Sequence, residues 1–142
     1  ELKDELIKLI DDDTNCFNGV IDAMRLPKNT DDEIKFRHLA IQEATKIATY
    51  SPLSILEACA SVMPLAKLAA NEGNPNSISD AGVAAEMAHA GAQGGAMNVL
   101  INLADIDDEA FCNEMKAKVE ETLLLVNEQL IKIRKTVIAA LL

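Results

Sequence analysis

The segment from Ser79 to Leu103 has helical spacing, and one side of it carries no large aliphatic side chain. Steps of three and four residues from Asp80 reach Ala84, Met87, Gly91, Gly94, Asn98 and Asn102. Each glycine inside a helix costs roughly 1 kcal/mol relative to alanine. The pattern predicts that another helix or a ligand approaches this backbone closely, and the two asparagines favour a partner that needs hydrogen bonds.

The composition predicts an all-α fold in one domain that covers residues 1–142. Apolar residues make up 49% of the chain and aromatic residues only 3%, which suits a core packed between helices. Pro27, the Thr30/Glu33 capping box, the Ser51-Pro52 pair and Gly73 indicate helix ends. We expect an antiparallel bundle of about five long helices, over about 1–24, 30–50, 51–73, 79–103 and 108–142.

The formal charge of −10 argues against nucleic acid and against an anionic membrane surface as partners. No stretch reads as a membrane span or a signal peptide. The three cysteines, Cys16, Cys59 and Cys112, are far apart in the sequence and show neither disulfide nor zinc spacing. No metal site is expected, and a cytoplasmic location fits best.

Three consecutive aspartates at 11–13 are candidates for acid–base chemistry, although a solvated charge run is the simpler explanation. Asp13 lies four residues before Phe17, and an aspartate beside a buried aromatic ring would suit proton transfer. Asp80 is either an N-cap or first-turn acid of this helix or a site residue. Asn98 and Asn102 either bridge helices or line a site. Arg25 and Lys28 are either cations at a helix end or a carboxylate-binding pair.

Several motifs together resemble the cyclodeaminase domain of formiminotransferase-cyclodeaminase and its bacterial relatives. They are Asp13-Thr14-Asn15-Cys16-Phe17, Arg25-Leu26-Pro27-Lys28-Asn29-Thr30, Ser51-Pro52-Leu53, Ser79-Asp80-Ala81-Gly82-Val83-Ala84-Ala85 and Asn98-Val99-Leu100-Ile101-Asn102-Leu103. The resemblance implies an all-helical homodimer that acts on a tetrahydrofolate derivative and needs no metal or redox cofactor. Relatives usually begin with a further helix rich in Gly, Ala and Ser, and we expect no counterpart of that helix within residues 1–142.

The resemblance also implies roles for the candidate residues. The catalytic acid would be Asp13 or Asp11, with Asp13 preferred. Asp80, Asn98 and Asn102 would line the pterin side of the site, and Arg25 and Lys28 would hold the glutamate tail. The expected reaction converts 5-formiminotetrahydrofolate to 5,10-methenyltetrahydrofolate and ammonia. Two alternatives are a methenyltetrahydrofolate cyclohydrolase and a non-catalytic helical interaction module.

Overall fold

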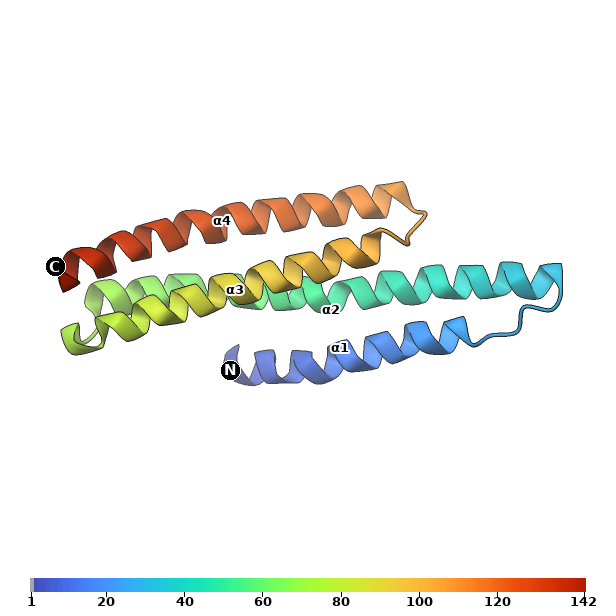
Figure 1. Ribbon diagram of the computed structural model, residues 1–142, viewed down its shortest axis with the longest axis horizontal. Coiled ribbons are helices and arrows are strands. Elements are labelled where there is room, and N and C mark those ends of the chain that lie inside the picture. Colours follow the sequence, from blue (N-terminus) through green and yellow to red (C-terminus); the bar gives the residue numbers. More distant parts are fainter. Residues whose placement is uncertain (1) are drawn as a thin grey trace.

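The computed structural model describes residues 2–142, and within this range the protein is all-helical, as predicted. Its elements are α1 (Leu2–Met24), α2 (Asp31–Glu72), the short 3-10 helix η1 (Pro75–Ser77), α3 (Ile78–Leu103) and α4 (Glu109–Leu141). The four long helices run alternately up and down, so that each is antiparallel to the next along the chain (Figure 1). The bundle topology is the predicted one, but it contains four long helices rather than five.

The prediction of separate helices over 30–50 and 51–73 is wrong. α2 is a single helix of 42 residues that includes both Pro52 and Pro64. Proline has no backbone N–H, so Pro52 leaves the carbonyl of Ala48 without its helical donor. The side-chain amide of Asn102 on α3 donates to that carbonyl at 3.3 Å. A partner from another helix therefore replaces the missing bond at the predicted break.

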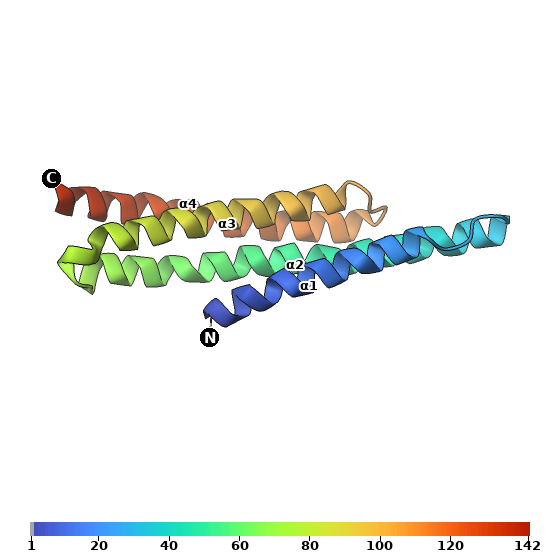
Figure 2. The same cartoon turned by 60° about the horizontal axis from the view of Figure 1, so that its bottom comes forward.

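The core lies between α2, α3 and α4. α2 packs against each of the other long helices, and α4 also packs against α3. Leu56 and Met63 of α2, Val99 of α3 and Met115 of α4 are completely shielded from solvent. Within residues 2–142, α2 is the one helix that is long and apolar enough to cross a membrane. Core helices of proteins outside membranes meet the same two criteria. α1 lies on α2 at the edge of the bundle and buries only Val20 and Ala23 among its described residues (Figure 2).

The small residues of α3 are divided between two sides of the helix. A Cβ added to Gly95 would lie 2.8 Å from the carbonyl oxygen of Pro52, and one added to Gly91 would lie 2.7 Å from Cys59 Sγ. The close neighbour expected from the glycines is thus α2. Gly94 has open space around it, and Met87 is 68% exposed. The expectation that all the small and polar residues spaced three and four apart from Asp80 to Asn102 face one partner is therefore wrong: Gly91 faces α2, whereas Met87 and Gly94 do not.

Candidate functional site

A cavity of about 560 Å³ lies over α2, between α1 and the C-terminal half of α3. Its lining combines apolar side chains with two carboxylates and two amides: Asp13, Phe17, Val20, Met24, Ile41, Thr45, Ala48, Pro52, Asn98, Ile101, Asn102 and Asp105. A cavity of similar size between α2 and α4, about 580 Å³, contains none of the residues that the sequence nominated. The cavity over α2 is therefore the candidate site.

The cavity is elongated along the axes of α1 and α2. From Asp13 to Met24 on α1, and from Pro52 to Ile41 on α2, the lining covers twelve residues, or about 16 Å of helix. Because these helices are antiparallel, Asp13 and Pro52 lie toward one end and Met24 and Ile41 toward the other. Gly95 of α3 contacts Pro52, which lies at the Asp13 end of the cavity. Asn98 follows Gly95 by about one helical turn, so it also lies toward the Asp13 end.

The structure brings together three of the residues nominated from the sequence, Asp13, Asn98 and Asn102. Phe17 also lines the cavity, but it is 61% exposed, so the expectation that it is a buried aromatic neighbour of Asp13 is wrong for the described residues 2–142. Asp11 is exposed and is not part of the lining. Only one of the two candidate acids therefore reaches this cavity.

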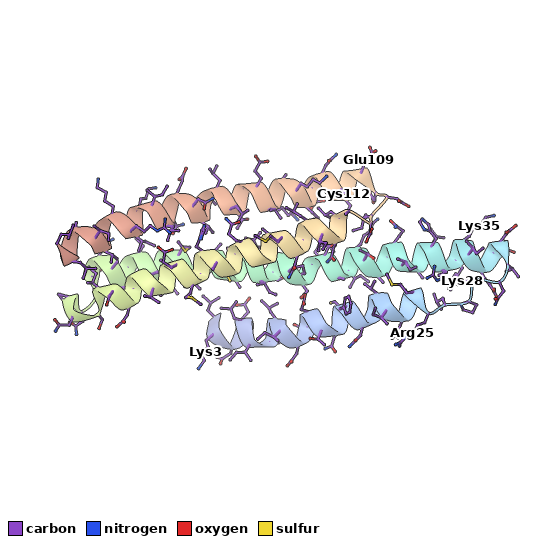
Figure 3. The ribbon with its side chains drawn as sticks, viewed as in Figure 1. Lys3, Arg25, Lys28, Lys35, Glu109 and Cys112 are labelled. Atoms are coloured by element: carbon purple, nitrogen blue, oxygen red, sulfur yellow. The ribbon has the colours of Figure 1, made fainter. Side chains whose placement is uncertain are left out.

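The remaining nominated residues lie elsewhere. Asp80 is eighteen residues before Asn98, or about 27 Å along α3, which is too far for it to line the same cavity of one chain. The side chain of Arg25 pairs with Asp22 at 3.2 Å. Lys28 follows in the connection to α2 (Figure 3). Neither cation lines the cavity, and the roles assigned to these three residues stay predictions.

Asn102 has a structural role that the sequence left as an alternative. Its Nδ2 atom donates to the carbonyl of Ala48, and the Oδ1 atom remains able to accept hydrogen bonds. The same residue therefore bridges α3 to α2 and lines the cavity. Its position in the site depends on the gap that Pro52 makes in the hydrogen bonding of α2.

This dependence leads to a prediction about stability. Asn102→Ala should lower the free energy of unfolding by about 1–2 kcal/mol, because the buried carbonyl of Ala48 loses its donor. In a Pro52→Ala background the backbone N–H of residue 52 can serve that carbonyl, so the cost of Asn102→Ala should shrink by more than half. Urea denaturation of the four proteins measures this coupling. Equal costs in the two backgrounds would contradict it.

Side chains of α2 form hydrogen bonds and an ion pair with the connection between α3 and α4. The sequence did not predict a functional role for these side chains. The amide of Gln42 donates to the carbonyl of Asp105 at 2.7 Å and accepts from the N–H of Asp107 at 2.8 Å. Lys46 bonds to Asp108 at 2.7 Å, and this bond lowers the pKa of the Asp108 carboxyl. These contacts fix the backbone beside Asp105, which lines the cavity.

His38 adds to the same support, with its Nε2 atom 2.9 Å from a carboxylate oxygen of Asp107. His38, Gln42 and Lys46 are spaced four residues apart, so they lie along one side of α2. The spacing of these three polar residues is the sequence signal that could have predicted their contacts with the α3–α4 connection. Within residues 2–142, no three His, Cys, Asp or Glu side chains are arranged to hold a metal ion.

Comparisons with known proteins agree with the motif pattern. A family model described as formiminotransferase-cyclodeaminase matches residues 1–121. Over 119 residues the chain is 44% identical to a methenyltetrahydrofolate cyclohydrolase of Methylorubrum extorquens, covering 84% of this chain and 57% of that protein. Over 120 residues it is 36% identical to a formimidoyltransferase-cyclodeaminase of Gallus gallus, covering 84% of this chain and 22% of that protein.

The fold has a counterpart among solved structures. The crystal structure of a formiminotetrahydrofolate cyclodeaminase from Thermotoga maritima superimposes with a TM-score of 0.81 at 27% identity. The match covers 95% of this chain and 63% of that one. The present chain thus spans between about a fifth and two thirds of the length of these relatives.

Proposed function

The chain belongs to the formiminotransferase-cyclodeaminase family, and from this membership we propose that it binds a tetrahydrofolate derivative in the cavity over α2 and acts on its one-carbon unit. The observation that carries the proposal is that Asp13, Asn98 and Asn102 line the same elongated and partly apolar cavity. A carboxyl group can accept and return a proton, and amides can match the donors and acceptors of a pterin ring.

Hydrolysis of 5,10-methenyltetrahydrofolate is the first candidate reaction, because the 44% identical relative is named for it. Water adds to the methenyl carbon while Asp13 takes one of its protons. This gives an intermediate whose former methenyl carbon bears a hydroxyl group. Asp13 then gives its proton to N5 as the bond from this carbon to N5 breaks. The hydroxyl proton leaves to solvent, so the one-carbon unit remains as a formyl group on N10. The role of the protein is to hold the folate, orient the water and move this proton.

Cyclodeamination is the second candidate, favoured by the relatives that carry this name and by the solved structure. Here the N10 nitrogen attacks the formimino carbon of 5-formiminotetrahydrofolate, the ring closes, and ammonia leaves. Asp13 takes the N10 proton and gives a proton to the departing nitrogen. Ring closure is intramolecular, so a cavity that fixes the folate in a reactive conformer supplies much of the rate. Neither reaction needs a metal or a redox cofactor.

Two assays with the purified chain separate these reactions. Hydrolysis removes the near-ultraviolet absorbance of 5,10-methenyltetrahydrofolate, whereas cyclodeamination releases ammonia from 5-formiminotetrahydrofolate and produces that absorbance. We expect turnover in the first assay to exceed turnover in the second. Absence of both activities, together with no heat on titration with folinic acid, would contradict the proposal and favour a helical interaction module.

We also propose that the protein is a homodimer. Large apolar side chains are exposed on α1 and α3 next to the cavity, among them Phe17 at 61% and Ile101 at 69%. Exposed apolar surface of this kind is commonly covered by another protein surface. A second copy placed there would shelter the cavity from solvent. Light scattering after size-exclusion chromatography should give twice the mass of the chain, and a monomer at micromolar concentration would contradict this.

A further inference from the structure

Arg37 stands beside the end of the cavity that lies farther from Asp13. It is one helical turn before Ile41, which lines the cavity, and its Nε atom donates to the carbonyl of Met24 at 3.0 Å. Met24 lines the cavity from the opposite helix. This bond fixes the Nε end of the Arg37 side chain between the ends of two lining segments, and the residue as a whole is half-buried.

Arg37 forms none of the ion pairs found among residues 2–142, and its Nε atom bonds to a backbone carbonyl. That bond leaves the two Nη groups, which can bind a carboxylate in a bidentate manner. Arg25, which the sequence nominated for such a role, instead pairs with Asp22. The chain has a net charge of −10. An arginine without a carboxylate partner among the described residues, beside the candidate site, therefore indicates a position that binds an anionic group of a ligand.

A folate has its reactive nitrogens near the pterin and carries two carboxylates on a glutamate at the opposite end. If the one-carbon unit lies at Asp13, the extended molecule can follow the groove toward Met24 and Ile41 and reach Arg37. We infer that Arg37 binds a carboxylate of the glutamate tail and so determines the preference for glutamylated substrate. The inference rests on the proposed function, because it takes the cavity over α2 as the folate site.

Asp105 lies near the same end of the cavity, on the side of the α3–α4 connection. Its carboxylate repels an anionic tail, whereas Arg37 on the α1 side attracts it. The tail is thereby directed toward Arg37. Replacing these two residues should change the affinity for a glutamylated ligand in opposite directions.

Calorimetry with two ligands tests the inference. 5-Formyltetrahydrofolate carries the glutamate, and 5-formyltetrahydropteroate lacks it. We expect Arg37→Gln to weaken binding of the first ligand about tenfold and to leave binding of the second within about twofold. Glutamine keeps an N–H donor for the carbonyl of Met24, so the change mainly removes charge. Asp105→Asn should tighten binding of the first ligand only.

Arg25→Gln is the matched control, since it removes a cation near the same turn that already has a partner. It should change binding of either ligand by less than about twofold. A larger loss in Arg25→Gln than in Arg37→Gln, or an equal loss for both ligands in Arg37→Gln, would overturn the assignment. If the wild-type chain binds the two ligands equally well, the inference fails while the folate site stands. If it binds neither, both proposals fail.

Discussion

Asp13→Asn should lower turnover at least about a hundredfold while leaving the affinity for folinic acid within a few-fold of the wild type. The substitution keeps the size and polarity of the side chain but removes its ability to take up and return a proton. Asp13 is the candidate acid that lines the cavity, where it shares the lining with Asn98 and Asn102. Steady-state kinetics and calorimetry on the same preparation separate the loss of proton transfer from a loss of binding.

The chain provides a closely matched control two residues earlier. Asp11→Asn makes the same chemical change on the same helix, but Asp11 is exposed and does not line the cavity. We expect its turnover to stay within about twofold of the wild type. If Asp11→Asn and Asp13→Asn have equal effects, or if Asp11→Asn is the more damaging, the assignment of the acid is wrong.

Gly95→Ala should lower the free energy of unfolding by about 2 kcal/mol. The added Cβ would meet backbone atoms of α2, 2.8 Å from the carbonyl oxygen of Pro52 and 2.9 Å from the nitrogen of Leu56. Backbone atoms inside a helix cannot rotate away as a side chain can, so α3 must move from α2 across a buried contact. This loss outweighs the gain of up to about 1 kcal/mol that alanine brings to a helix interior.

Gly94→Ala is the control for this effect, since it adds the same atoms to the same turn of α3. A Cβ at Gly94 has no heavy atom within 4 Å, so only the helix propensity changes. We expect it to raise the free energy of unfolding by about 0.5–1 kcal/mol. Urea denaturation of both variants should show shifts of opposite sign. Two shifts of the same sign would contradict the packing of α3 on α2 through Gly95.

Much of the fold follows from local sequence signals. The ends of α1 and α3 agree with the prediction because the apolar period, Pro27 and the turn after Gly73 are all local features. The capping box of Thr30 and Glu33 is present at the start of α2. The break expected at Ser51-Pro52 is absent because its compensation comes from Asn102, which lies 54 residues away from Ala48. A propensity argument takes no account of such a distant donor.

The site was predictable to a smaller extent. Asp13, Asn98 and Asn102 were nominated from spacing and family resemblance, and the structure brings them to one cavity. Arg37 was not nominated, because its significance depends on its contact with Met24. That contact arises from the antiparallel register of α1 and α2. The sequence likewise did not reveal that Phe17 is exposed, because an amphipathic helix does not show which of its apolar residues lack a neighbour.

The equal twelve-residue spans of α1 and α2 along the cavity have a consequence for changes of chain length. Each residue inserted into a helix rotates the residues before it by about 100° relative to the residues after it, and moves the two parts about 1.5 Å further apart along the axis. A single insertion between Asp13 and Met24 would therefore rotate the acid out of the groove, or else break the contact of Met24 with Arg37. Point substitutions on the outer side of this segment should be tolerated, whereas insertions and deletions should abolish the site without unfolding the bundle.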